Sequence, residues 1–298
     1  MSDAAAEAAA ADAPAAADAS AAAEVPAAAE SPGAVDAPSA AESPAAAESR
    51  VPGAHPPAKV EPASVPVRRV SWRPSYRLIP SRYPTVGLYD AIADPADLDV
   101  VFAIEALANP RIRDELGEIT LVAKEERVTG PGATPVMAAF THLNKDGSRF
   151  SDGTYGVYYA AHSLDTAIAE VSHHRAVFLR ATCEPAIDID MRLVTASVEA
   201  DLHDLAELGE AANSPNRFAA VLDPDDYGPS QALGRALRAI ESWGVRYPSV
   251  RHAGGECVGI FRPRALRHAR SAAHLALCWD GARMTHWYEK RPPHAVNE

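Results

Sequence analysis

Hydrophobic and polar positions along the chain predict a mixture of helices and short strands. The clearest helical pattern covers residues 164–178, where apolar side chains recur every three or four residues. Ser163 stands where a helix cap is favoured, and Asp165 falls in the first turn, where the helix dipole favours a carboxylate. A further helix is predicted from Pro229 through Trp243, since proline suits the first turn of a helix.

Shorter apolar runs predict strands, and their order along the chain indicates the fold class. Two alternating runs near the C-terminus flank Asp280-Gly281, a dipeptide typical of a hairpin turn. The helices and strands do not follow regular βαβ spacing, so we expect an α+β fold with a mainly antiparallel sheet and flanking helices. Strands are predicted at residues 76–79, 118–123, 157–161 and 186–194, and another helix at 198–209.

Residues 1–66 differ in composition from the remainder of the chain. They consist mostly of Ala, Pro, Ser and acidic residues, with prolines that interrupt any helix and few apolar side chains to bury. We therefore expect residues 1–66 to be a disordered, solvated tail and residues 67–298 to form one folded domain.

The distribution of charged residues along the chain bears on whether the protein binds nucleic acid. The chain carries a net charge of −12, and residues 1–66 contain ten acids but two bases, which leaves 30 acids and 26 bases in the remainder. This near balance does not favour direct nucleic-acid binding. No apolar run approaches the roughly 18 residues needed to cross a bilayer, so no membrane span is expected.

Cysteine usage and metal-ligand spacing point away from disulfides and metals. Cys183, Cys257 and Cys278 are isolated and odd in number, which is typical of a reduced, cytoplasmic protein. Glu170 and His173 have the E-x-x-H spacing of di-iron helices, but such sites need a second pair that the sequence lacks. No metal site is therefore expected.

Three polar residues lie at awkward positions in the segment from Arg149 to Phe178. Arg149 opens a glycine-punctuated loop, Tyr159 falls on the strand that follows, and Glu170 lies at the edge of the helix face that must be buried. A carboxylate there is costly unless it is paired or used. Either a structural ion pair between Arg149 and Glu170 or a functional site would account for this pattern.

Four short motifs decide between these interpretations. They are G-x-G-A near Gly130, R-F-S-D-G from Arg149, G-V-Y-Y-A-A with T-A-I-A-E, and Y-P-S-V-R around Ser249. Tyr159 lies ten residues after Arg149, and Glu170 lies eleven residues further on. In these motifs and this spacing the chain resembles the RES domain family, named after an Arg, a Glu and a Ser.

The resemblance covers most of residues 76–263 and implies a compact fold similar to ADP-ribosyltransferases. It also implies that NAD is consumed as a substrate, without a cofactor. The resemblance carries over six site residues: Glu170, Arg149 and Tyr159 as catalytic residues, and Arg77, Ser249 and Tyr158 as substrate-binding residues.

The implied reaction is cleavage of the nicotinamide–ribose bond of NAD, with water or inorganic phosphate as the acceptor. Two alternatives are left open: transfer of ADP-ribose to a protein, and a non-catalytic binding module with the same fold. The resemblance further implies a common role as the toxin of a toxin–antitoxin pair, with a helix-turn-helix antitoxin as partner. Monomeric and homodimeric states are both left open.

Overall fold

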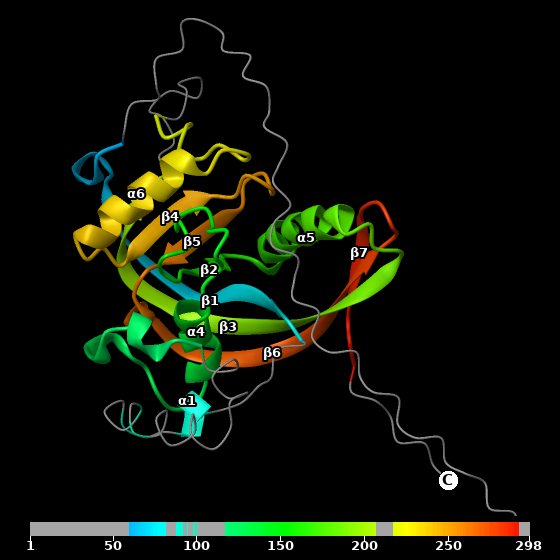
Figure 1. The fold of residues 1–298 in the computed structure, drawn as a ribbon, viewed down its shortest axis with the longest axis horizontal. Coiled ribbons are helices and arrows are strands. Elements are labelled where there is room, and N and C mark those ends of the chain that lie inside the picture. Colours follow the sequence, from blue (N-terminus) through cyan, green and yellow to red (C-terminus); the bar gives the residue numbers. More distant parts are fainter. Residues whose placement is uncertain are drawn as a thin grey trace, which may run out of the picture. The chain divides into compact units, whose positions relative to one another are not determined.

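The computed structural model describes residues 60–81, 88–91, 94, 98, 100, 117–206 and 217–291. This part of the chain contains seven strands and four α-helices, joined by loops and short turns (Figure 1). The helices are α1 (Leu88–Ala91), α4 (Ala133–Thr141), α5 (Leu164–Ala181) and α6 (Gly228–Ala239). The strands are β1 (Val67–Pro80), β2 (Tyr158–Ala161), β3 (Ile187–Asp204), β4 (Gly244–Pro248), β5 (Glu256–Ile260), β6 (Leu266–Trp279) and β7 (Met284–Glu289).

The strands form one sheet in the order β1-β2-β5-β4-β3-β6-β7, with β1 also paired to β3. Because β1 pairs with β2 at Tyr76↔Ala161 and with β3 along most of its length, five strands are joined in a closed circuit. The pairing of β3 with β4 is parallel, and the other pairings between the described strands are antiparallel. The predicted α+β class with a mainly antiparallel sheet is confirmed.

Three helices cover separate groups of buried side chains, which fixes their positions around the sheet (Figure 1). Met137 of α4 belongs to a core cluster with residues of β1 and β3. Leu233 of α6 packs in a second cluster with Phe150, and Ile168 of α5 packs in a third with Leu193 of β3. The site described below lies where the second and third clusters meet, because Tyr76 packs against both.

Several sequence predictions differ from the structure. The helix predicted at 198–209 is wrong, because β3 continues through Asp204, with Val198, Ala200 and Leu202 buried at alternate positions. The strand predicted at 118–123 is also wrong, since Ile119–Leu121 forms a 3-10 turn. Further short 3-10 turns lie at Pro62–Ser64, Lys124–Glu126 and Pro263–Ala265.

Two predicted boundaries move. The helix α6 ends at Ala239 instead of Trp243, and the exposed Ile240 follows it. Residues 1–59 of the predicted tail lie outside the described part of the chain. Residues 60–66 do not behave as a tail, because Val65 is buried in the core cluster that contains Phe150.

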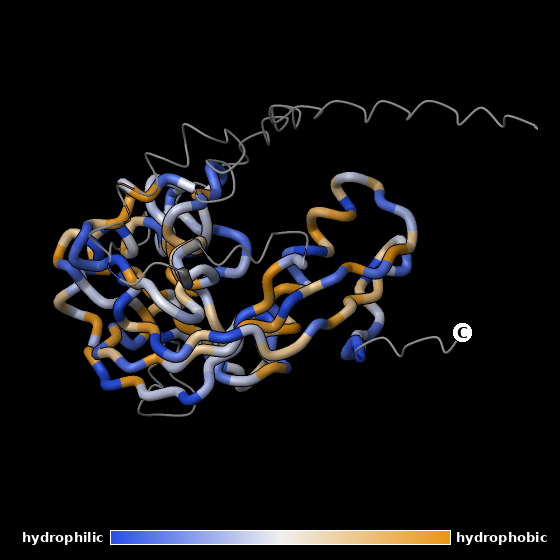
Figure 2. Tube along the Cα trace, turned by 90° about the horizontal axis from the view of Figure 1, so that it is seen from below, coloured by the Kyte–Doolittle hydropathy of each residue, from blue (hydrophilic) through white to orange (hydrophobic). Residues whose placement is uncertain are grey.

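Polar and apolar residues alternate in short stretches along the chain (Figure 2). Within the residues that the structure describes, none of the helices has the length and apolar character required to cross a membrane. Apolar side chains buried among the described residues form four clusters.

Candidate functional site

The helix α5 presents Glu170 to a cavity. The Ser163 side chain caps the helix by accepting a hydrogen bond from the Thr166 backbone N–H at 3.2 Å, as the sequence predicted. Ile168 is buried against the sheet, so Glu170, two residues later, falls at the edge of the buried face and is half-buried. The helix thus holds a carboxylate beside a cavity instead of within the core.

The loop before β2 positions Arg149. Gly147 has a φ of +77°, a conformation that other residues rarely adopt, and a Cβ there would lie 2.7 Å from the Ser151 carbonyl oxygen. Arg149 is 8% exposed, and its Nη1 donates to the Asp223 carbonyl at 2.8 Å. Its Cζ also lies 4.6 Å from the centroid of the Tyr227 ring, a cation–π contact. One segment distant in sequence, from Asp223 to Tyr227, therefore holds this guanidinium.

Tyr159 is fixed at both ends. Its hydroxyl accepts a hydrogen bond from the Phe150 N–H at 2.9 Å and lies 2.8 Å from the Ser148 hydroxyl. Its backbone carbonyl accepts from Arg77 Nη1 at 2.9 Å. Burial raises the pKa of Tyr159 to about 12, so the phenol is neutral at physiological pH. The ring is therefore a rigid, uncharged wall of the cavity.

Ser249 holds the carboxylate of Glu170. The Ser249 hydroxyl donates to Glu170 Oε1 at 2.6 Å, while the backbone N–H groups of Arg251 and His252 donate to the Ser249 oxygen. Because those two donors occupy the lone pairs of the hydroxyl, its hydrogen is directed at the carboxylate. The hydrogen bond from Ser249 therefore fixes Oε1 of Glu170, and Oε2 does not take part in it.

Cys257 completes this side of the site. Its sulfur donates to Glu170 Oε1 at a distance of 3.9 Å, and its side chain is buried. Burial, followed by the negative charge of Glu170, raises the pKa of the Cys257 thiol well above its ordinary value. Cys257 is therefore a neutral thiol, as expected for a buried cysteine, and not an activated nucleophile.

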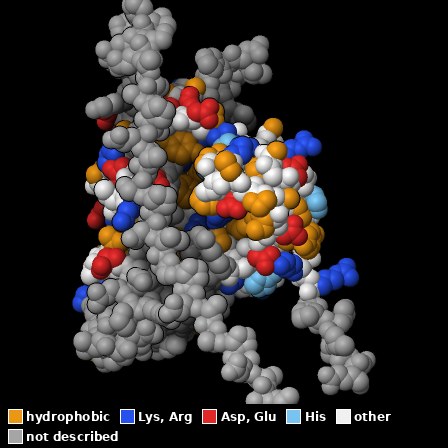
Figure 3. Space-filling view, turned by 45° about the vertical axis from the view of Figure 1, so that its right-hand side comes forward, with side chains coloured by type: hydrophobic (Ala, Val, Ile, Leu, Met, Phe, Trp, Pro, Cys, Tyr) orange, Lys and Arg blue, Asp and Glu red, His pale blue; other side chains and the backbone are white. Residues whose placement is uncertain are grey.

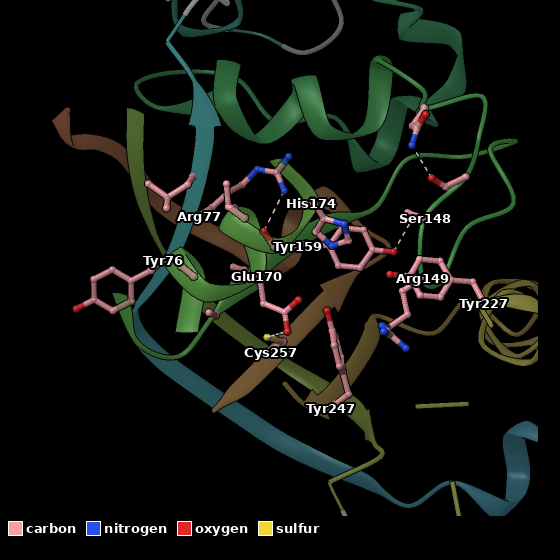
Figure 4. Close-up of a pocket in the computed structure, with 17 residues that line it drawn as sticks. Tyr76, Arg77, Ser148, Arg149, Tyr159, Glu170, His174, Tyr227, Tyr247 and Cys257 are labelled. Carbon is pink, nitrogen blue, oxygen red and sulfur yellow. Dashed lines mark hydrogen bonds between the residues drawn. The ribbon is translucent and has the colours of Figure 1, made fainter. Parts of the chain in front are cut away.

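One cavity of about 390 Å³ is lined by Arg149, Tyr159, Glu170 and Cys257, together with Arg77. In the close-up, Glu170, Tyr159 and Tyr247 point toward the same space, and Arg77 and Arg149 lie on different sides of it (Figure 4). Its volume falls within the roughly 300–1,000 Å³ of small-molecule sites. The cavity combines two cations, a carboxylate and aromatic faces, which suits a ligand with both charged and planar parts.

The structure does not contain the ion pair that was the alternative interpretation of Arg149 and Glu170. Among the described residues, no ion pair joins the two side chains, and each has the other partners given above. Apart from the bond of Nη1, the Arg149 guanidinium makes no hydrogen bond within this part of the chain. Its free N–H groups are therefore available to a ligand.

The six residues carried over from the resemblance do not all reach the cavity. Arg77, Arg149, Tyr159 and Glu170 line it, whereas Ser249 acts on it through Glu170. Tyr158 does not line it: this side chain is 0% exposed in the core, because consecutive residues of a strand point to opposite faces.

Several residues that line the cavity were not singled out in the sequence. Tyr247 lies two residues before Ser249 on a strand, so the alternation of β4 is a signal that could have identified it. Ser148 adjoins Arg149, another local signal. His174 lies four residues after Glu170 on α5, so helical spacing is a signal that could have identified it. Tyr227 carried no such signal, since its place at the cavity depends on how distant segments pack. Within the described residues, no group of three or more His, Cys, Asp or Glu side chains is placed to hold a metal ion.

Comparison with known proteins agrees with the motifs. The family model described as RES domain matches residues 124–280. An uncharacterized protein, y4oC, of Sinorhizobium fredii (strain NBRC 101917 / NGR234) is 28% identical over 217 residues, which cover 72% of this chain and 86% of that protein. A chain in the crystal structure of the M. tuberculosis MbcT-MbcA toxin-antitoxin complex aligns over 69% of this chain and 86% of its own length, with 16% identity and a TM-score of 0.38.

Proposed function

This chain belongs to the RES domain family, and we propose that it consumes NAD by cleaving the bond between nicotinamide and ribose. One observation carries the proposal: Glu170, Arg149, Tyr159 and Arg77, which are scattered over 94 sequence positions from 77 to 170, line a single cavity. A carboxylate, two guanidinium groups and an aromatic ring suit the ribose, the pyrophosphate and the nicotinamide of NAD.

The chemistry assigns the central role to Glu170. Nicotinamide departs with the electron pair of the glycosidic bond and becomes neutral, so positive charge develops on the ribose as an oxocarbenium ion. The Glu170 carboxylate opposes that charge and accepts a hydrogen bond from a ribose hydroxyl. Water or inorganic phosphate then adds to the anomeric carbon, and the proton of the acceptor is released to solvent.

The other residues hold and orient the substrate. Arg149 offers unpaired N–H groups for phosphate oxygens, and the planar guanidinium suits two parallel hydrogen bonds. The fixed Tyr159 ring provides a face on which the nicotinamide stacks. Ser249 acts as a positioning residue, because it touches Glu170 and does not line the cavity.

The biological role that we propose is that of a toxin in a toxin–antitoxin pair. A helix-turn-helix antitoxin that covers the cavity is the proposed partner, and it would suppress NAD consumption by excluding the substrate. Coexpression with a candidate antitoxin would restore growth to cells that the free protein inhibits.

The decisive experiment compares wild type with Glu170→Gln in an assay of NAD consumption. The amide keeps the size and the bond to Ser249 but loses the charge, so about 3 kcal/mol of transition-state stabilisation disappears and turnover falls roughly a hundredfold. Glu289→Gln, at an exposed position on β7, is the matched control and should retain full activity.

The products distinguish the acceptors. Release of nicotinamide with ADP-ribose indicates water, and a phosphorylated ADP-ribose formed only in phosphate buffer indicates phosphate. Label transferred from NAD to a protein would indicate the transferase alternative. Intact NAD after prolonged incubation with the wild type would contradict the proposed function.

A further inference from the structure

A second cavity adjoins the first and is larger. It has a volume of about 570 Å³, compared with about 390 Å³ for the cavity at Glu170. The two cavities share five lining residues, which are Arg77, Leu78, Asn144, Ser148 and Tyr159. The shared residues therefore form a junction between two spaces, one on the Glu170 side and the other on the side of α4.

The second cavity differs in chemistry from the first. Its described lining contains three basic side chains, Arg77, His142 and Arg175, and no carboxylate. Much of the remaining wall is apolar, including Ala138 of α4 and Val157 of the loop before β2. Apolar walls with a basic rim suit a planar, uncharged group that is attached to an anion.

Arg77 at the junction is incompletely satisfied. Its Nη1 donates to the Tyr159 carbonyl and its Cζ lies 4.7 Å from the Tyr158 ring centroid, but its Nε is buried without a hydrogen-bond partner among the described residues. Burial lowers the pKa of Arg77 below its ordinary value, since desolvation disfavours the charged form. An unpaired buried donor of this kind is costly. Because Arg77 lines both cavities, an anion at the junction would pair with the charge of its guanidinium.

We propose that the second cavity holds the adenosine half of the dinucleotide, with the pyrophosphate shared between Arg77 at the junction and Arg149 in the first cavity, and the nicotinamide riboside half beside Glu170. This inference rests on the proposed function. The first cavity lies near the lower end of the size range of small-ligand sites, whereas a dinucleotide contains two nucleosides and a pyrophosphate. The second cavity supplies the space, the apolar walls and the positive charge that the other half requires.

The test fills the second cavity without touching the first. Ala138 lines the second cavity but not the first, so Ala138→Phe projects a ring into the second space. With NAD as substrate, we expect kcat/KM to fall about tenfold or more, mainly through KM, because the lost contact is one of binding. With nicotinamide mononucleotide, which lacks the adenosine half, kcat/KM should change less than about twofold.

Two further variants serve as a control outside the cavities and as a test of Arg77. Ala181→Phe places the same ring at the exposed end of α5, outside both cavities, and should leave both substrates unaffected. Arg77→Lys keeps a charge but removes the planar fork, and should raise the KM for NAD. The assignment of the second cavity to adenosine would be overturned if Ala138→Phe lowered kcat/KM equally for NAD and nicotinamide mononucleotide. An unchanged KM for NAD in Ala138→Phe would overturn it as well.

A binding measurement separates this inference from the proposed function. Calorimetric titration with ADP, which carries adenosine and a diphosphate but no scissile bond, should show binding to wild type and about tenfold weaker binding to Ala138→Phe. If wild type left NAD intact but bound ADP in this way, the proposed reaction would be wrong and the second cavity would remain a nucleotide site. If ADP bound both proteins equally or neither, the inference would fail whatever the reaction.

Discussion

The two halves of α5 are one continuous helix but differ in how they are held. In residues 164–171, the N-cap bond of Ser163 and the burial of Ile168 fix the helix against the sheet. In residues 172–181, Ala176 and Leu179 are buried but Val177 is 50% and Phe178 is 55% exposed. Figure 3 shows hydrophobic side chains among the charged ones on the visible face of the described part.

This difference shows that the Glu170 side chain lies in the half of α5 that is held more firmly. Glu170 belongs to the held half and receives a hydrogen bond from Ser249 across the loop between β4 and β5. Thr166, one turn earlier, lies 2.8 Å from a ring nitrogen of His252 in the same loop. The loop therefore contacts the helix at two successive turns, and the carboxylate lies at the second contact. Stability and activity are therefore expected to follow this division.

Ile168→Ala should have the largest effect, because it empties a buried position that packs with Leu193 and Leu275. We expect a loss of about 3 kcal/mol in the free energy of unfolding, measured by urea denaturation. Val177→Ala in the exposed half is the control and should cost less than about 1 kcal/mol. Equal losses for the two variants would remove the distinction between the halves.

Ser249→Ala should impair catalysis while leaving substrate binding intact. Loss of a hydrogen bond to a charged group costs about 1.5 kcal/mol, so kcat for NAD consumption should fall roughly tenfold at nearly unchanged KM. Ser249→Thr retains the hydroxyl and should restore most of the rate, and Ser271→Ala at an exposed position of β6 should have no effect. A rise in KM without a fall in kcat would instead mean that Ser249 contacts the substrate.

Ser163→Ala should produce a moderate loss of stability. Removing the N-cap hydrogen bond to the Thr166 N–H costs about 1 kcal/mol in the free energy of unfolding. Ser163→Asp also accepts this bond and should come within about 0.5 kcal/mol of wild type. Thermal denaturation of the three proteins checks the order, and an unchanged midpoint for Ser163→Ala would show that the cap contributes nothing.

Phe178→Ser should have the smallest effect. The side chain is largely exposed, so its replacement should change the free energy of unfolding by less than about 0.5 kcal/mol. NAD consumption should also be unaffected, because Phe178 lines neither cavity. A loss comparable with that of Ile168→Ala would show that the second half of the helix is as tightly held as the first.

Local patterns in the sequence predicted much of the fold. The helix α5, its Ser163 cap and the C-terminal hairpin around Asp280-Gly281 were all predicted and are present. These features depend on neighbouring residues, whose spacing the sequence displays directly. The helix predicted at 198–209 failed for the opposite reason, since long-range pairing of β3 with β1 overrides the helical tendency of Ala, Glu and Leu.

The sequence also determined which residue types come together, through the spacing of Arg149, Tyr159 and Glu170. Their mutual geometry was decided by tertiary structure. Of the Tyr158-Tyr159 pair, Tyr159 faces the cavity because consecutive residues of a strand point to opposite faces. Its strand partner Gly259 leaves room for the ring, since a Cβ there would lie 3.3 Å from a Tyr159 ring carbon. Ser249, which donates a hydrogen bond to Glu170, lies 79 residues further along the chain, and the β4–β5 loop brings it to the carboxylate. Local preferences for helix, strand and turn depend on neighbouring residues and can be recognised in the sequence. Contacts between distant segments form only when the sheet is assembled, because the energies of these contacts depend on the completed packing.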